Sequence, residues 1–259
     1  MKPMITRRTG FATLLAASLL DAEPSATPPP AVADNFPSQP AELVRETVLV
    51  AHGNVKRLRE LVDAHPDLAK AAIDWGFGDW EDALGAASHV GNREIAEHLI
   101  AHGARPTLYS ATMFGQLDVV KAFVAAQPGC QKIPGPHSIS LLAHAKNGGP
   151  AAEPVFRYLE SLGDAGAPPA APITVEELTA LAGTYSFGTA PRNTIEITLA
   201  KTQLMFTRPG SMARGLVHLG NHTFHPAGAP AVRIGFAIEK SVATLTVHDP
   251  DPILIAKRG

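Results

Sequence analysis

A glycine recurs through the first half of the chain, with small and apolar residues at fixed distances on either side of it. In two segments a leucine stands seven residues before the glycine and an alanine stands four before it: Leu84, Ala87 and Gly91, then Leu108, Ala111 and Gly115. An apolar pair follows eight and nine residues after each glycine. This spacing predicts short helices that turn back on one another and bury their apolar faces against the next repeat. The turn needs a residue with positive φ, which glycine adopts at little cost.

Two further segments keep part of the pattern. Leu142, Ala145 and Gly149 have the same spacing before the glycine, whereas the segment around Gly53 keeps only the apolar residues after it. A terminal repeat has one face in water, so an incomplete first copy is expected. Asn54 and Asn92, each directly after its glycine, are expected to cap the helix that follows.

These repeats resemble the ankyrin family, most closely from Asp79 to Pro106. The run from Ala101 to Pro106 is similar to the family's end-of-helix signature, and Asp82–Gly85 stands where the family has Thr-Pro-Leu-His. Asp82 can cap a helix as threonine does, but Gly85 lacks the histidine side chain. The resemblance covers residues 42–165 and implies about four repeats. A generic array of helical hairpins is the alternative.

The spacing of the repeats singles out one loop. Gly53, Gly91, Gly115 and Gly149 are 38, 24 and 34 residues apart, against an ankyrin period of about 33. The first interval therefore holds a long finger, Ala71–Trp80, which contains both tryptophans of the chain. In the family, fingers and first helices contact protein partners. The hypothetical partner-binding residues are Trp75, Phe77, Trp80, Tyr109, Met113 and Phe114.

The same tryptophans have a purely structural interpretation. Trp80 would then pack under the finger, and Trp75 would shield the incomplete first repeat. Exposed aromatic side chains are common anchors of interfaces, so the functional interpretation predicts that Trp75 and Phe77 are exposed.

The N-terminus has the layout of an export signal. Lys2, Arg7 and Arg8 precede a short apolar run, residues 11–20, which is too short to span a bilayer as a helix. The arginine pair resembles a twin-arginine signal, although Phe11 stands one position later than usual. We expect cleavage after Ala33, a linker over residues 34–41, and a periplasmic or secreted protein with no membrane contact beyond export.

The helical pattern ends at a stretch rich in Gly, Ala and Pro, which predicts a linker over 166–173 and a separate domain over 174–259. A short helix, Val175–Leu181, is expected first, and apolar alternation broken by Gly, Pro and Asn then predicts strands. The expected strands are Thr184–Phe187, Thr194–Leu199, Gln203–Thr207, Gly215–His218, His222–His225, Ala231–Ala237, Ala243–Val247 and Leu254–Ala256. Eight short strands indicate a small antiparallel barrel or a curved sheet.

The start of this domain, from Leu178 to Tyr185, resembles the lipocalin-like domain that is appended to serine β-lactamase-like hydrolases. Leu204, Phe224 and Phe236 fit its later strands. The resemblance implies a fold more than an activity. The expected fold class is α+β multidomain, an α-helical ankyrin solenoid followed by the β domain.

Composition and missing motifs narrow the function. The net charge of −2 gives no basic field for nucleic acid, and the single Cys130 excludes an internal disulfide or a cysteine-based zinc site. No hydrolase, metalloprotease or P-loop motif occurs, and Glu81 stands where a dinucleotide loop beginning at Gly76 would need its third glycine. We therefore expect a protein-binding module rather than an enzyme. Binding of a small apolar ligand by the β domain is the alternative.

Two groups of histidines raise the question of a metal. His98 and His102 are four residues apart on one predicted helix, but no glutamate follows His98 as a metalloprotease helix requires. His218, His222 and His225 lie on neighbouring predicted strands near Asp249 and Asp251. Helix-end and surface chemistry explain both groups, so the sequence predicts no metal and no cofactor.

Overall fold

A computed structural model describes residues 35–240 and 242–259. The predicted signal peptide, residues 1–33, lies outside the described residues, and its role stays a prediction. All helices and strands of the described part belong to one compact unit, Ser38–Gly259. No helix in these ranges has the length and the apolar character that crossing a lipid bilayer requires.

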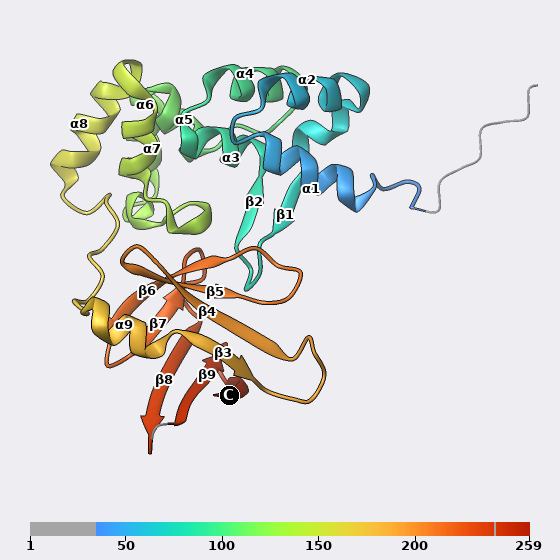
Figure 1. Ribbon diagram of the computed structural model, residues 1–259. Coiled ribbons are helices and arrows are strands. Elements are labelled where there is room, and N and C mark those ends of the chain that lie inside the picture. The colour runs from blue at the N-terminus through green and yellow to red at the C-terminus, as the bar shows by residue number, and fades with distance from the viewer. Residues whose placement is uncertain (1–34, 241) are drawn as a thin grey trace, which may run out of the picture. The chain divides into compact units, whose positions relative to one another are not determined.

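Helices in consecutive pairs make up the first part of this unit (Figure 1). They are α1 (Ala41–Val50) with α2 (Val55–Ala64), α3 (Ala83–Val90) with α4 (Arg93–Ala101), α5 (Leu108–Phe114) with α6 (Leu117–Ala126), and α7 (Leu141–Asn147) with α8 (Glu153–Leu162). Short 3-10 helices cover Pro66–Lys70, Cys130–Lys132, Pro136–Ser138 and Gly149–Ala152. The first helices of the pairs contact one another, and α7 contacts both α3 and α5, so the array is not regular.

Glycines allow the close approach between pairs. Gly91 and Gly115 both have φ of 76°, as the repeat pattern predicts. A Cβ on either one would collide with a backbone carbonyl, that of Asn147 or Ala151, so only glycine fits. At Gly53 the same expectation is wrong, because its φ is not positive and no other part of the chain comes within 4 Å of where a Cβ would be.

The three side chains that the sequence predicts as helix caps are in place. Asn54, Asn92 and Asp82 each accept a hydrogen bond from the backbone N–H three residues later, at 3.1, 3.1 and 2.6 Å. Each bond satisfies one of the unpaired donors at a helix N-terminus, so the sequence-based expectation for these caps is confirmed.

The long interval between the first two repeats forms a β-hairpin. Strands β1 (Ala72–Asp74) and β2 (Trp80–Asp82) pair antiparallel, and Figure 1 shows them extending from the helices toward the barrel. At the tip, Gly76, Phe77 and Gly78 have φ of 110°, 59° and 75°. Phenylalanine rarely adopts such a conformation, so the packing of Phe77 described below has to offset its cost.

The second part is a closed antiparallel barrel preceded by α9 (Val175–Leu181). Its strands, in chain order, are β3 (Gly183–Ser186), β4 (Thr194–Ala200), β5 (Gln203–Thr207), β6 (Arg214–Gly220), β7 (Thr223–Pro226), β8 (Arg233–Glu239), β9 (Val242–His248) and β10 (Pro252–Arg258). Each strand neighbours the next, and β10 pairs with β3 to close the barrel. The eight expected strands are confirmed, to within two residues at each end.

Side chains fill the barrel. Tyr185 and Phe224 are at most 1% exposed, and Leu178 and Leu181 of α9 belong to the same apolar core. The Tyr185 hydroxyl donates to the Leu181 carbonyl at 2.7 Å and so fixes α9 to the first barrel strand. The barrel therefore has a packed interior, and its ends are the places where it meets other groups.

Candidate metal centre

A buried carboxylate, Glu81, lies at the base of the β1–β2 hairpin. It is 1% exposed, whereas the preceding residue, Trp80, is 64% exposed. Successive side chains of a strand point to opposite faces, so β2 directs Glu81 inward and Trp80 outward. An isolated buried carboxylate is strongly unfavourable, and the groups around Glu81 therefore decide what this position can do.

Three histidines surround that carboxylate. His52 follows the end of α1, His89 lies in the last turn of α3, and His137 lies in the Pro136–Ser138 turn. The Nε2 atoms of His52 and His137 are 3.6 and 3.3 Å from Glu81 Oε2, and that of His89 is 3.5 Å from Oε1. The ligand atoms of His52, Glu81 and His137 all lie within 4.8 Å of one another.

These separations match a metal centre better than a set of hydrogen bonds. Two ligands at 2.0–2.1 Å from a tetrahedral zinc ion are about 3.3 to 3.4 Å apart. Contacts of 3.5 and 3.6 Å are too long for ordinary hydrogen bonds. Small side-chain movements would bring His52, Glu81 and His137 onto one ion.

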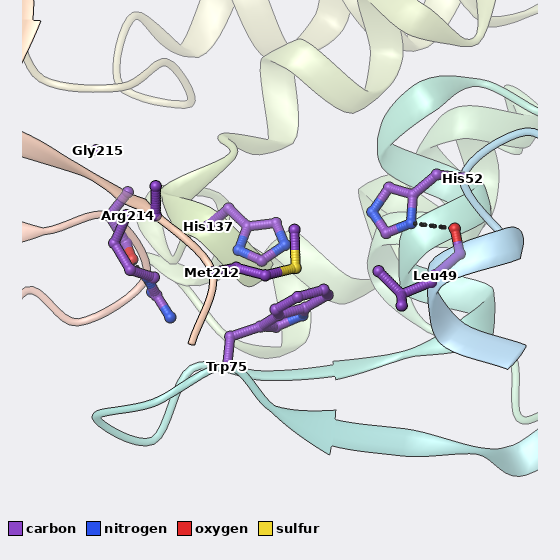
Figure 2. Close-up of a pocket in the computed structure, with 9 residues that line it drawn as sticks. Leu49, His52, Trp75, His137, Met212, Arg214 and Gly215 are labelled. Atoms are coloured by element: carbon purple, nitrogen blue, oxygen red, sulfur yellow. Dashed lines mark hydrogen bonds between the residues drawn. The ribbon is translucent and has the colours of Figure 1, made fainter. Parts of the chain in front are cut away.

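The other nitrogen of two of these rings is held as metal-bound histidines require. His52 Nδ1 approaches the Val48 and Leu49 carbonyls at 3.1 and 3.2 Å, and Figure 2 marks the bond to Leu49. His137 Nδ1 lies 2.9 Å from Asp79 Oδ2. Carbonyl and carboxylate oxygens only accept, so Nδ1 carries the proton in both rings. Once Nε2 carries no proton, as metal binding requires, its lone pair faces Glu81 in both rings, as in the carboxylate–histidine–metal arrangement.

Charge at the centre is set by burial and by close pairing. Burial alone would raise the pKa of Glu81, but the hydrogen bond and the charge of His137 outweigh it and hold that pKa below its usual range. Burial would also lower the pKa of His137, but its bonds to Asp79 and Glu81 raise it to about 9. Trp75 Nε1 donates a further hydrogen bond to Glu81 Oε2, at 2.8 Å. Glu81 is therefore a charged, oriented carboxylate.

Buried polar atoms at this centre lack hydrogen-bond partners. Within the part of the chain that the structure describes, both ring nitrogens of His89 and the Oε1 atom of Glu81 are in this state. Burial lowers the pKa of His89 to about 4, so the ring is neutral near pH 7. Buried polar groups are nearly always paired, and an ion bound by the carboxylate would give Glu81 Oε1 a partner.

A second buried carboxylate, Asp79, ties the centre to the barrel. Its carboxylate accepts from the His137 backbone N–H at 3.0 Å and from Arg214 Nη2 at 2.7 Å. Arg214, at the start of β6, also donates to the carbonyls of Gly76 and Ala227. A Cβ on Gly228 would collide with the Asp79 carboxylate. Hairpin, histidine turn and barrel are therefore fitted closely around Asp79.

The centre opens onto a cleft of about 350 Å³. The side chains of His52 and His137 are 31% and 27% exposed, whereas that of Glu81 is 0% exposed. Figure 2 shows Trp75 and Met212 beside the two rings. The remaining lining residues are Leu49, Ala213, Arg214, Gly215 and Ala227. The two histidines thus reach the cleft, and the carboxylate stays behind them.

Three residues of the hypothetical partner-binding set lie on the hairpin and have different surroundings. Trp75 lines the cleft and holds Glu81, as described above. Phe77 packs against the barrel core, with its ring centre 6.0 Å from that of Phe206. Only Trp80 of these three is exposed.

The other three lie in α5. Met113 is fully buried, and Phe114 packs against the helical core beneath the guanidinium of Arg93. The Tyr109 hydroxyl donates to the Ile133 and Pro134 carbonyls. The six residues therefore do not form one exposed surface.

In the structure, the carboxylate of Asp63 lies beside His98 and His102, the histidine pair of one predicted helix. Asp63 Oδ1 lies 3.1 Å from His98 Nε2 and 3.6 Å from His102 Nε2, and the three ligand atoms are mutually within 4.8 Å. Asp63 is exposed, and Arg59 Nη1 lies 3.3 Å from His98 Nδ1. A neighbouring guanidinium opposes the binding of a cation. We refer to these residues as the surface cluster.

The second histidine group is dispersed. His218 Nδ1 donates to the Ala171 carbonyl, His225 Nδ1 to the Pro226 carbonyl, and His222 lies 3.9 Å from Glu177. None of these three histidines belongs to a metal-ligating group among the described residues.

Sequence reasoning missed His52, His89, His137 and Glu81. Glu81 and His137 are 56 residues apart, and no motif links them. One signal was present: His52 stands one residue before Gly53 and His89 two before Gly91, so a histidine recurs at the end of the first helix in two repeats. In the structure these two rings pack edge to face, with their centres 4.9 Å apart.

Two imidazoles and one carboxylate form a ligand set that suits zinc and other first-row divalent metals. Three protein ligands leave at least one coordination position open, which is the arrangement of metal sites that bind a water or a substrate. Comparison of the chain with family models, with curated proteins and with solved structures finds no match to any of them.

Proposed function

We propose that this protein binds a divalent transition-metal ion, zinc in the first place, through His52, Glu81 and His137. The observation that carries the proposal is the buried Glu81 carboxylate with three imidazole Nε2 atoms at 3.3 to 3.6 Å. Zinc accepts nitrogen and oxygen ligands in tetrahedral geometry, which fits both the ligand types and the spacing.

A simple ion pair explains less of the same geometry. A protonated His137 between Asp79 and Glu81 accounts for the short contacts of that one ring. It leaves His52 and His89 facing the same carboxylate at 3.6 and 3.5 Å without a hydrogen bond. An ion shared by His52, Glu81 and His137 accounts for the convergence of these three side chains.

The test is the zinc content of the full chain after removal of loosely bound metal by dialysis against a chelating resin. We expect the wild type to retain one equivalent and Glu81→Gln, which keeps the shape of the side chain, to retain none. The double variant His52→Ala, His137→Ala should behave in the same way. Circular dichroism checks that each variant is folded.

The matched control removes the surface cluster instead. The variant His98→Ala, His102→Ala deletes two histidines of that cluster and leaves the Glu81 centre intact, so we expect it to keep its zinc. Zinc retained by Glu81→Gln but lost from this control would overturn the proposal and assign the metal to the surface cluster.

We also propose that the paired helices are ankyrin repeats, that the barrel is of the lipocalin-like type, and that a twin-arginine signal exports the chain. The positive φ of Gly91 and Gly115 and the Asp82 cap support the first assignment, and the closed eight-strand barrel supports the second. Export rests on the sequence of residues 1–33 alone. Fractionation of cells that produce an Arg7→Lys, Arg8→Lys variant tests it, because normal export would contradict it.

A protein partner is the second candidate function, and the exposure of Trp80 favours it. At 64% exposure this ring is the member of the hypothetical set that remains free to contact another molecule. Affinity capture from an extracytoplasmic extract should weaken with Trp80→Ala and persist with Val119→Ala, a control at an exposed apolar position of α6. Unchanged capture by Trp80→Ala would contradict this role.

A further inference from the structure

We propose that the occupied metal centre takes a small-molecule ligand with a metal-coordinating head group and an apolar body, seated in the cleft beside His52 and His137. This inference rests on the proposed function, since the head group needs the metal. It adds the class of ligand and the surface that selects it.

The burial of the surrounding side chains fixes the direction of the open coordination position. The Glu81 carboxylate and His89 are buried, whereas the side chains of His52 and His137 are about 30% exposed and line the cleft. An ion held by His52, Glu81 and His137 therefore has protein behind it and the cleft in front of it. Its open position faces the cleft, where Figure 2 shows Trp75 and Met212.

The walls of the cleft are mostly apolar. Apart from the two histidines, the side chains around the cleft are mostly apolar: Leu49, Trp75, Met212, Ala213 and Ala227. A cleft of about 350 Å³ suits a small ligand, and apolar walls contribute affinity by removing apolar surface from water. Met212 is 48% exposed, and its flexible thioether can adapt to ligands of different shape.

The cleft does not favour a ligand with an anionic body. Arg214 also lines it, but its terminal nitrogens already donate to Asp79 and to two backbone carbonyls. Three of its five N–H donors are thus occupied, and the Asp79 carboxylate already balances its charge, so this guanidinium is a weak anchor for a phosphate or a second carboxylate. The body of the ligand is apolar rather than anionic, and the metal is the polar anchor.

The cleft also continues toward the barrel. An adjoining cavity of about 350 Å³ shares Trp75, Met212 and Arg214 with it. The walls of that cavity are mostly apolar, and Ser211 and Arg208 are its other polar groups. The apolar residues are Phe77, Phe206, Val247, Ile253 and Leu254. Because the barrel interior is packed, its mouth is where an apolar ligand can lie, and an extended body would reach it from the metal.

The experiment uses the full chain loaded with Co²⁺, whose visible absorption changes when a ligand enters the coordination shell. Acetohydroxamate and benzohydroxamate share the metal-coordinating group and differ in the body. We expect both to shift the cobalt spectrum, and benzohydroxamate to bind about tenfold more tightly because its ring is buried in the cleft.

Variants distinguish the contribution of the ligand's apolar body from that of its metal-coordinating head group. Met212→Ala should weaken benzohydroxamate severalfold and leave acetohydroxamate unchanged. Met205→Ala, a control on β5 outside both cavities, should change neither. This pattern would support the apolar cleft as the selecting surface.

The failures are distinguishable. One equivalent of cobalt with no spectral response to either hydroxamate would overturn this inference and leave the metal-binding function standing. Equal affinity for the two hydroxamates, together with no effect of Met212→Ala, would also overturn it. Failure to bind cobalt at all would overturn the proposed function and the ligand with it.

Discussion

Among the described residues, two groups join two histidines to one carboxylate, and they differ in the burial of that carboxylate and in the charges beside it. The ligand atoms of His52, Glu81 and His137, like those of the surface cluster, lie within 4.8 Å of one another. Glu81 is buried, and hydrogen bonds from outside the set orient its ligand rings. Asp63 is exposed, with a guanidinium beside the cluster. Residue types and spacing alone therefore do not distinguish a built site from a surface coincidence; burial of the carboxylate and the charge of the groups around the rings do.

The largest expected difference between the Glu81 centre and the surface cluster is the contribution of each to the stability of the fold. Asp79 is 3% exposed and pairs with Arg214 and His137, so Asp79→Ala leaves buried charges without a partner. We expect it to lower the free energy of unfolding by about 3 to 5 kcal/mol. The corresponding change in the surface cluster, Asp63→Ala, should cost less than about 1 kcal/mol.

Urea unfolding of the metal-free proteins measures both costs. If Asp79→Ala does not fold, Asp79→Asn keeps the volume and should still be clearly less stable than the wild type. Equal stabilities of the Asp79 and Asp63 variants would contradict the distinction between a built and an incidental cluster.

The next expected difference is the pH dependence of metal affinity. In the metal-free protein the pKa of His137, which faces Asp79, Glu81 and His89, is about 9, so the ring is protonated at pH 7. A metal must displace this proton, so affinity should rise about tenfold per pH unit well below pH 9, and about 50-fold in all from pH 7 to 9. Burial and the neighbouring His102 lower the pKa of His98, so the surface cluster should show no such rise above pH 7.

The metal-free protein should respond to pH in the opposite sense. A pKa raised above its unfolded value of about 6.5 contributes stability that is present below pH 6.5 and lost as pH rises through 9. Competition titrations against a zinc chelator, with proton release followed by an indicator dye, measure the binding side. A pH-independent affinity at the Glu81 centre would contradict His137 as a ligand.

The same contrast explains what could be predicted from sequence. The barrel strands follow from local alternation of apolar residues, and Gly91 and Gly115 follow from a repeat that can be read along the chain. The Glu81 centre depends on three elements that folding brings together, so neither period nor motif encodes it. The repeat spacing singles out the aromatic finger, but Trp75 and Phe77 are partly buried against His137 and Phe206 rather than exposed as expected, which no local pattern reveals.

A hydrogen bond to Glu81 from Trp75, outside the ligand set, should have a smaller effect on zinc affinity. Trp75→Phe removes the Nε1 donor to Glu81 Oε2 and keeps an aromatic ring in the cleft. Zinc affinity should fall about tenfold, the lower end of what loss of an outer hydrogen bond costs a metal site. Trp80→Phe, one residue before Glu81 and exposed, is the matched control and should have no effect. A smaller loss from Trp75→Phe than from Trp80→Phe would show that this hydrogen bond does not orient the carboxylate.

The smallest expected effect is a gain, and it concerns the surface cluster. Arg59 Nη1 lies 3.3 Å from His98 Nδ1, where its charge repels a cation bound by the cluster. In water, unit charges about 4 Å apart interact by about 1 kcal/mol, so Arg59→Ala should strengthen zinc binding there about fivefold. The measurement is made in the His52→Ala, His137→Ala background, so that only the surface cluster is titrated. Arg157→Ala, which removes an exposed arginine of α8, controls for net charge. The gain should disappear in about 1 M salt, because screening acts strongly on exposed charges. A gain that persists in high salt would mean that Arg59 obstructs the cluster sterically, and the electrostatic distinction between the two clusters would then be wrong.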